Sequence, residues 1–370
     1  MHVGRPNIGN RDSFLRRAGQ ILDNCWLTNN GQMVRELEER IAARLGVKHC
    51  VAITNGTLAL EIAIRALGLS GEVIIPSWTF IATAHALHWQ GITPVFADID
   101  PTTHNLSPAA VRDMITSRTT GIIGVHLWGR PAPIEDLQAI ADEHGLKLMF
   151  DAAHAFGNLY QGRSIGNFGI CEVFSFHATK TFNTMEGGAV ITHDDELAEK
   201  MRLMRNFGFH GNDNVIYPGT NGKMTEICAA FGLTNLESLD DIFAVNQRNY
   251  QAYARALSDV PDVRLLAHDE NSSRNYQYVV LEIQEGNKAS RDEIIAALHQ
   301  NNVLARKYFW PGVHAMQPYR DLFPHAALLL PETVKIAEKV IVLPTGMAVD
   351  EAMIGRIAEI IRQKISGQSI

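Results

Sequence analysis

Hydrophobic residues recur at helical spacing near the start of the chain. Val34, Leu37, Ile41 and Leu45 lie three or four residues apart with charged residues between them, and Gly46 follows them. This spacing indicates one apolar face of a helix that ends at the glycine. Similar patterns predict helices over 57–67, from 107 onwards and over 133–144.

Short apolar runs separate these helices, and the runs are nearly continuous rather than alternating. They predict strands over 49–54, 72–77, 93–98, 121–127, 146–151, 174–176 and 189–192. Strands that are apolar throughout suit a sheet covered on both faces by helices, which implies mostly parallel strands. Ligands of such sheets gather at the carboxyl ends of the strands, so we expect chemistry in the residues just after them.

The pattern changes after about residue 239. Ser290, with Glu293 three residues later, has the spacing of a capping box that opens a helix to residue 299. The other predicted elements are a helix over about 240–258, strands near 263–266, 276–283 and 303–308, and a terminal helix over 353–364. The sequence therefore predicts an α/β chain with two domains. The large domain (1–240, N-terminal arm included) has a mostly parallel mixed sheet flanked by helices, and a small α+β domain (241–370) follows.

Composition and charge exclude several classes of protein. The chain has 370 residues, with 33 basic and 40 acidic side chains and a net charge of −7, which argues against binding nucleic acid by bulk charge. No apolar run approaches the ~18–20 residues of a membrane span, and the first residues lack the apolar core of a secretion signal. The four cysteines are scattered singly, which argues against disulfides and a zinc site. We therefore expect a cytoplasmic protein that binds no metal.

The turn Asn55-Gly56-Thr57 joins a predicted strand to a predicted helix. Free backbone amides and the helix dipole favour an anion at such a turn. Gly56 would let a ligand approach the backbone, and Thr57 would add a hydroxyl. An ordinary turn in which Thr57 caps the helix is the alternative. Neither of the usual glycine-rich nucleotide motifs is present, so ATP and dinucleotide binding lose their main support.

Asp151 ends the predicted strand 146–151, in the stretch DAAHAFG. An unpaired buried carboxylate costs several kcal/mol, so Asp151 needs a partner, and a protonated ring nitrogen would serve. His154 lies three residues further on. The alternative is a helix N-cap that is satisfied by its own backbone.

Lys180 closes the stretch SFHATK, just after the predicted strand 174–176, and has apolar neighbours on both sides. Burial lowers the pKa of a lysine, and the neutral amine can form a Schiff base. A single lysine is more often a solvated surface charge, but Ser175 and Thr179 add hydroxyls to this stretch.

Together these groups match what pyridoxal phosphate needs. Gly56 and Thr57 would hold the phosphate, Asp151 would keep the pyridine nitrogen protonated, and Lys180 would hold the aldehyde. Phe80, in PSWTFIAT, could stack on the ring. By residue type alone, however, a phenylalanine would more often lie in the core.

Several motifs in order carry a family resemblance: NGTLAL, VIIPSWTFIATAHAL, VFADID, VHLWG, DAAHAFG, SFHATK…EGGAVIT and NGKMTEICAAFGL. Over roughly residues 25–350 the chain resembles the DegT/DnrJ/EryC1/StrS family of sugar aminotransferases. The resemblance implies a fold-type I, pyridoxal-phosphate-dependent enzyme that acts on nucleotide-linked keto-sugars. It also implies that Lys180 binds the cofactor and carries protons, that Asp151 binds the pyridine nitrogen, and that His154 lies near the ring.

The same resemblance implies further cofactor-binding residues. Gly56, Thr57 and Ser175 match positions that bind the phosphate, and Phe80 matches an aromatic residue that stacks on the ring. Asn221, in TNGKM, resembles an asparagine that reaches the neighbouring subunit's site, which implies a homodimer with shared active sites.

The resemblance also implies the substrates. L-glutamate would donate the amino group and leave as 2-oxoglutarate, and the acceptor would be dTDP-4-keto-6-deoxy-D-glucose, because the motifs look like the branch that forms 4-amino-4,6-dideoxyglucose. Asn55 and the loop TFNTMEGG are less typical and leave the substrate subgroup open. Arg306, Lys307 and Tyr308 are equally plausible as nucleotide-binding and as surface residues.

Three alternatives remain at this point. A 3-aminotransferase would act on a dTDP-3-keto-6-deoxyhexose. A related sugar 3-dehydratase would have histidine in place of Lys180, so the lysine argues against it. A regulatory protein that holds pyridoxal phosphate without turnover would have no need of Lys180, Asp151 and His154 together.

Overall fold

A seven-stranded sheet forms the centre of the computed structural model, which describes residues 1–269, 271–272 and 274–368. The strand order is β1-β9-β8-β5-β4-β2-β3. The strands are β1 (His49–Ile53), β2 (Glu72–Pro76), β3 (Thr93–Ala97), β4 (Thr119–Val125), β5 (Lys147–Asp151), β8 (Glu172–Ser175) and β9 (Gly188–Thr192). Only β9 is antiparallel to its neighbours, β1 and β8, which confirms the predicted mostly parallel mixed sheet.

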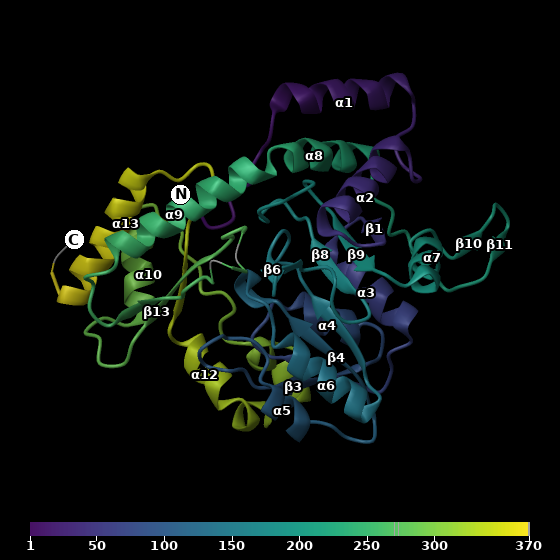
Figure 1. Ribbon diagram of the computed structural model, residues 1–370. Coiled ribbons are helices and arrows are strands. Elements are labelled where there is room, and N and C mark those ends of the chain that lie inside the picture. Colours follow the sequence, from purple (N-terminus) through teal and green to yellow (C-terminus); the bar gives the residue numbers. More distant parts are fainter. Residues whose placement is uncertain (270, 273, 369–370) are drawn as a thin grey trace.

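Helices cover both faces of this large sheet (Figure 1). They are α2 (Gln32–Leu45), α3 (Gly56–Leu67), α4 (Ala82–His88), α5 (Pro108–Asp113), α6 (Ile134–His144), α7 (Asp195–Met204) and α8 (Glu226–Glu237). Successive strand residues belong to different core clusters: Leu148 and Phe150 pack with α2, α6 and α8, whereas Met149 packs with α3, α4 and α7. Burial on both faces explains why the strands are apolar without alternation. Helix α1 (Arg11–Asp23) lies over α8, where Phe14 meets Phe231 edge to face at 5.2 Å.

A small antiparallel sheet follows in the C-terminal part. It contains β12 (Val263–Leu265), β13 (Val279–Ile283) and β14 (Val340–Leu343), and it packs on α9 (Leu239–Ala256), α10 (Arg291–Gln300) and α13 (Glu351–Ser366). Ser290 and Glu293 form the predicted capping box of α10. The α+β character of this part is confirmed, while the domain boundary at residue 240 stays a prediction.

The predicted strand over 303–308 is wrong. Leu304 and Arg306 make only isolated bridges, to His2 and Val342 respectively. The Ala305 amide donates to the Val303 carbonyl at 2.9 Å, and this tight turn breaks the ladder. The remaining short elements are β6 (Leu159–Tyr160), β7 (Arg163–Ser164), β10 (Phe209–His210), β11 (Asn214–Val215), α11 (Tyr319–Leu322), α12 (Pro331–Ala337) and the 3₁₀ turns Leu127–Gly129, Val313–Ala315 and Ala326–Leu329.

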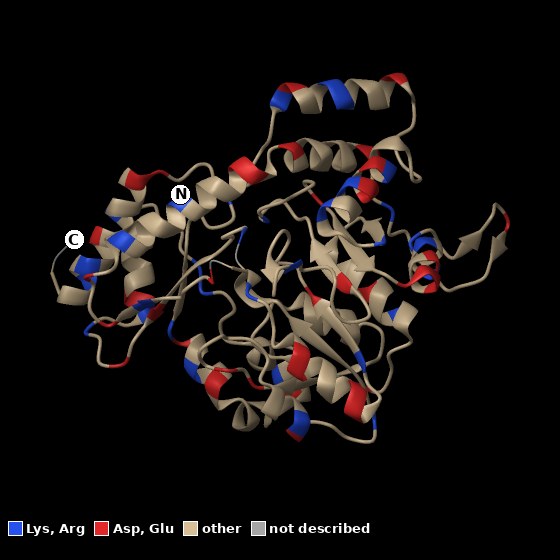
Figure 2. Cartoon of the chain, viewed as in Figure 1, with Lys and Arg blue, Asp and Glu red and all other residues tan. Residues whose placement is uncertain are grey.

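Charged side chains lie mainly on the outer helices, where both signs are interspersed in the view of Figure 2. Within the described ranges, no helix is long and apolar enough to cross a membrane.

Candidate active site

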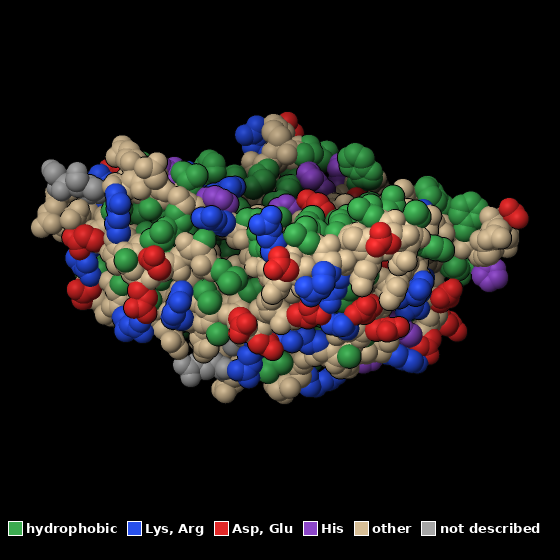
Figure 3. All heavy atoms as spheres, turned by 90° about the horizontal axis from the view of Figure 1, so that it is seen from above, with side chains coloured by type: hydrophobic (Ala, Val, Ile, Leu, Met, Phe, Trp, Pro, Cys, Tyr) green, Lys and Arg blue, Asp and Glu red, His purple; other side chains and the backbone are tan. Residues whose placement is uncertain are grey.

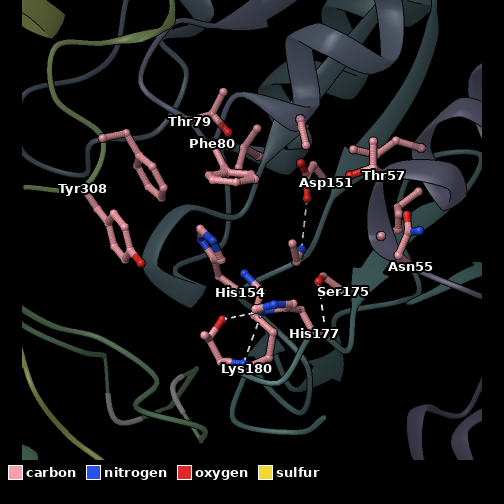
Figure 4. Close-up of a pocket in the computed structure, with 18 of the residues that line it drawn as sticks. Asn55, Thr57, Thr79, Phe80, Asp151, His154, Ser175, His177, Lys180 and Tyr308 are labelled. Atoms are coloured by element: carbon pink, nitrogen blue, oxygen red, sulfur yellow. Dashed lines mark hydrogen bonds between the residues drawn. The ribbon is translucent and has the colours of Figure 1, made fainter. Parts of the chain in front are cut away.

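Several strand ends of the large sheet open on one cavity. Because β1, β5 and β8 point the same way, the residues that follow them meet at a single edge. A cavity of about 270 Å³ lies there. Seven of the sequence-predicted site residues line it: Gly56, Thr57, Phe80, Asp151, His154, Ser175 and Lys180 (Figure 4).

The turn between β1 and α3 presents unpaired amides to this cavity. Asn55, not Thr57, is the N-cap of α3, and its Oδ1 accepts from the Leu58 amide at 2.8 Å. The alternative in which Thr57 caps the helix is therefore wrong. The amides of Gly56 and Thr57 have no acceptor within the described part of the chain. Free amides at a helix N-terminus form an anion site.

Two glycines let this turn lie tightly against the neighbouring strands. A Cβ built on Gly56 would lie 2.9 Å from the Cβ of Ser175, and one built on Gly188 would lie 2.8 Å from the Gly56 nitrogen. Larger side chains would force the turn away from β8 and β9. The close approach keeps the Ser175 hydroxyl beside the free amides.

Asp151 is held by two hydrogen bonds at the end of β5. Its Oδ2 accepts from the Thr83 hydroxyl at 2.8 Å and its Oδ1 from the Ala153 amide at 3.1 Å. No helix begins at Asp151, so the N-cap alternative is wrong. Burial raises the pKa of Asp151, and these two hydrogen bonds oppose that shift. The positive charge of Lys180 also lowers the pKa of Asp151, and a protonated ring nitrogen beside the carboxylate would lower it further.

Sequence reasoning missed the threonines that support Asp151. Thr83 lies on α4, and its hydroxyl is 3.1 Å from that of Thr79. Both side chains are buried. The signal that could have revealed them is a pair of threonines just after the strand β2, at the edge of the sheet where ligands gather.

Lys180 reaches the cavity from the loop that follows β8. Its amide donates to the His177 carbonyl at 2.8 Å, whereas its Nζ has no hydrogen-bond or ion-pair partner among the described residues. Burial lowers the pKa of Lys180 to about 8, although the charge of Asp151 opposes the shift. About half of the amine is therefore neutral and nucleophilic near pH 8.

His154 and aromatic side chains form the rest of the cavity. The His154 ring lies parallel to that of Phe309 at 5.8 Å, and Tyr278 meets it edge on at 4.9 Å. Burial lowers the pKa of His154 well below its usual range, so the ring is neutral. Phe80 is 54% exposed, which makes its placement in the core wrong. Figure 4 shows Phe80 and Lys180 on opposite sides of the cavity, with Tyr308 to one side.

The remaining candidate residues divide between the cavity and other places. Tyr308 lines the cavity, but Arg306 and Lys307 do not. Arg306 lies over the Tyr308 ring at 4.8 Å, and Lys307 pairs with Asp292 at 3.1 Å. Asn221 is exposed and lies outside its own chain's cavity.

The cavity fits pyridoxal phosphate. Gly56 and Thr57 offer amides to an anion, Asp151 offers a buried carboxylate to a cationic ring nitrogen, and Lys180 offers a partly neutral amine to an aldehyde. Phe80 and His154 offer flat surfaces to an aromatic ring. Each group of the cofactor thus has a complementary partner.

Comparison with known proteins agrees with this chemistry. The profile of the DegT/DnrJ/EryC1/StrS aminotransferase family matches residues 10–362. The chain is 35% identical to the dTDP-4-amino-4,6-dideoxy-D-glucose transaminase of Escherichia coli, over 98% of both chains. It is also 37% identical to the GDP-perosamine synthase of Caulobacter vibrioides, over 96% of this chain and 95% of the other.

The fold also matches solved structures. The crystal structure of DesI in the presence of its TDP-sugar product superposes with a TM-score of 0.94 at 48% identity, over 98% of this chain and 92% of the other. The aminotransferase PseC of Helicobacter pylori also superposes, with a TM-score of 0.90 at 28% identity over 98% of this chain and 99% of the other, so the mixed sheet and its helical layers are those of an aminotransferase.

Proposed function

The chain belongs to the DegT/DnrJ/EryC1/StrS aminotransferase family, and on that premise we propose that it aminates a nucleotide-linked keto-sugar with pyridoxal phosphate as cofactor. The proposed acceptor is dTDP-4-keto-6-deoxy-D-glucose, aminated at C4, and the proposed donor is L-glutamate, which leaves as 2-oxoglutarate. One observation carries the proposal: Lys180, Asp151 and the free amides of Gly56 and Thr57 line the same cavity.

Each residue has a defined task in this reaction. Pyridoxal phosphate, when bound, supplies an aldehyde that exchanges amines and a protonated ring that accepts the electrons of the donor's Cα–H bond. The neutral Nζ of Lys180 takes the Cα proton from the donor and returns a proton to the sugar carbon in the second half of the cycle. Asp151 holds the proton on the ring nitrogen, and the Gly56 and Thr57 amides with the Ser175 hydroxyl bind the phosphate.

The nucleotide and the position of amination rest on the relatives. The E. coli relative is named for a dTDP-linked 4-amino sugar, and the DesI structure was determined with a TDP-sugar product. A GDP-linked 4-keto sugar is a second candidate, because the similarity to GDP-perosamine synthase is equally high.

A homodimer is part of the proposal. The Gly222 carbonyl accepts from the Thr54 amide at 2.8 Å, so Asn221 lies beside the end of β1 but outside the cavity. Exposed apolar side chains lie near this segment, among them Leu27, Phe207 and Ile227. They are either close to it in sequence or joined to it by backbone hydrogen bonds. Figure 3, seen from above, shows hydrophobic side chains gathered along the upper part of this view, with charged side chains of both signs frequent below them. A second copy that covers such a face would receive Asn221.

Product analysis tests the substrate. The protein, loaded with pyridoxal phosphate and L-glutamate, is incubated separately with dTDP-4-keto-6-deoxyglucose, its GDP-linked counterpart and a dTDP-3-keto-6-deoxyhexose. NMR of the products should show an amine at C4 of the dTDP-sugar. Amination at C3, or of the GDP-sugar alone, would refute the proposed acceptor but not the chemistry.

The absorbance of the bound cofactor tests the enzyme class. Glutamate alone should bleach the band of the lysine-bound cofactor, because half of the reaction needs no sugar. A band that persists with glutamate would favour the regulatory protein. Borohydride reduction and peptide mapping should place the cofactor on Lys180, and a label elsewhere would contradict the assigned site.

Mixing two inactive variants tests the shared site. Lys180→Ala and Asn221→Ala subunits, if exchanged at random, form mixed dimers in which one site has both residues. Activity should return to about a quarter of the wild-type value. No recovery in demonstrably mixed dimers would contradict the role of Asn221.

A further inference from the structure

The first nine residues form an arm that crosses the loop carrying Lys180. At one end the Leu304 amide donates to the Met1 carbonyl at 2.7 Å. At the other end the Gly9 amide donates to Asn235 Oδ1, also at 2.7 Å. The arm therefore connects the segment after α10 with α8.

Between these ends the arm contacts the residues on both sides of Lys180. Gly4 lies against Thr179, where a Cβ on the glycine would be 2.9 Å from the threonine Cβ. On the other side Asn7 Nδ2 donates to the Thr181 carbonyl at 3.4 Å. Both neighbours of the lysine are thus fixed by the same short stretch of chain.

Asn7 forms several of the hydrogen bonds that hold the arm against the rest of the chain. Its Oδ1 accepts from the Met347 amide at 3.2 Å, and its carbonyl accepts from Asn183 Nδ2 at 3.0 Å. It is 6% exposed. One buried side chain therefore ties the loop that carries Lys180 to the segment that follows β14.

The irregular loop that carries Lys180 is held both by hydrogen bonds of its own and by contacts with distant segments. No helix or strand is present between β8 and β9 among the described residues. Within the loop the Lys180 amide donates to the His177 carbonyl and the Thr184 amide to the Phe176 carbonyl at 2.9 Å. Distant segments add further contacts, such as the Thr181 amide donating to Gln277 Oε1 at 3.2 Å. Removal of such contacts lets a loop open locally and admits water.

We infer that Asn7 is a positioning residue, which holds the Lys180 loop closed so that the Nζ faces the cavity and is shielded from water. The inference rests on the proposed role of Lys180. Asn7 touches neither substrate nor cofactor, and it acts only through Thr181 and the backbone of the loop.

The expected consequence is a change in how readily Lys180 loses its proton. The titratable groups that line the cavity with Lys180 are Asp151, His154, His177, Glu186, Tyr278 and Tyr308. None of them changes in an Asn7→Ala variant. A rise in the pKa of Lys180 in that variant would therefore report the entry of water, because burial is the main cause of its low value.

The test measures how fast pyridoxal phosphate attaches to the full chain after its cofactor has been removed. The rate, followed by absorbance over roughly two pH units on either side of the expected midpoint, should rise with a midpoint near 8 in the wild type. In Asn7→Ala the midpoint should move up by about one unit, which makes attachment at pH 7 about tenfold slower.

Asn10→Ala is the matched control. Asn10 lies three residues further along and caps α1, where its Oδ1 accepts from the Ser13 amide at 2.9 Å. Its removal should lower the melting temperature but leave the midpoint at the wild-type value. An equal shift in Asn10→Ala would overturn the specific role of Asn7.

Gly4→Ala is a second test, on the other side of Lys180, in case Asn7→Ala does not fold. Its added Cβ pushes on Thr179, and the midpoint should rise again. Folded Asn7→Ala or Gly4→Ala protein with an unchanged midpoint overturns the inference. If the wild type itself attaches no pyridoxal phosphate at Lys180, the proposed function fails instead.

Discussion

The two walls of the cavity are built in different ways. One wall consists of residues at the ends of β1, β5 and β8, whose positions follow from strand register and from backbone hydrogen bonds. The other consists of Tyr278, Tyr308 and Phe309, from the C-terminal part. Two of these three rings lie in the irregular segment after α10.

The two walls also differ in chemistry. The strand-end wall has the buried carboxylate and the free amides, and the lysine follows it directly. The C-terminal wall contributes rings and hydroxyls but no charged side chain to the cavity. A rigid sheet therefore holds the groups that we assign to the cofactor, while the C-terminal wall, with fewer backbone constraints, is the side that we propose for the sugar.

The largest loss is expected for Lys180→Ala, in the strand-end wall. Turnover should fall at least about a thousandfold, because Lys180 is the group to which we assign both the bond to the cofactor and the transfer of the Cα proton. Steady-state transamination measures the loss. Lys180→Arg is the control, since it keeps the positive charge but cannot lose its proton, and it should be equally inactive. Activity in the arginine variant would show that charge alone is enough.

Asp151→Asn should come next. Turnover should drop roughly a hundredfold while most of the cofactor is retained, since the amide removes the charge that stabilises a protonated ring. Cofactor content and kcat are measured together. Asp98→Asn is the matched control: Asp98 also follows a strand, β3, but accepts from the Thr333 amide at 2.9 Å and lies outside the cavity. It should lose stability and keep its turnover. Normal turnover in Asp151→Asn would reject the assigned role.

Gly56→Ala should have an intermediate effect, through geometry rather than charge. The new Cβ would meet Ser175 at 2.9 Å, so the turn must shift, at a cost of about 1–3 kcal/mol in the free energy of unfolding. Cofactor affinity should weaken as the amides move. Urea denaturation and cofactor titration measure the two effects. Gly355→Ala, in open space on α13, should not lose stability, and equal losses in both variants would refute the steric argument.

The smallest effect is expected on the C-terminal wall. Tyr308→Phe removes one hydroxyl from the cavity, which should raise KM for the keto-sugar about two- to tenfold, the value of one hydrogen bond. Cofactor content should not change. Tyr160→Phe, outside the cavity, serves as the control in the same kinetic assay. A loss of cofactor in Tyr308→Phe would mean that the C-terminal wall also holds the cofactor, which would contradict the proposed difference between the two walls.

The strand-end wall could be predicted from sequence because its signals are local. Buried parallel strands are continuous apolar runs, so Asp151 and the turn at Gly56 stood out as the polar residues directly after them. Lys180 followed from the same logic. The role of each of these residues in catalysis stays a prediction, although their positions around one cavity are now visible.

Most of the C-terminal wall could not be predicted from the sequence in the same way. Tyr278 and Phe309 reach the cavity through tertiary packing, for which apolar periodicity gives no signal. The predicted strand over 303–308 failed because the turn at Ala305 interrupts a run of strand-forming residues. Thr83 was missed for a related reason, since its partner Asp151 is distant in sequence and the contact exists only in the folded chain.

The reversed direction of β9 has a practical consequence for protein engineering. Because β8 and β9 are antiparallel neighbours, the connection between them leaves and re-enters the sheet at the same edge and needs no crossover. Because this connection carries Lys180, however, insertions or deletions in it would displace the lysine from the cavity even where the pairing of both strands is kept. Libraries meant to reshape the cavity should therefore keep the length of this connection and vary the segment around Tyr308 and Phe309 instead.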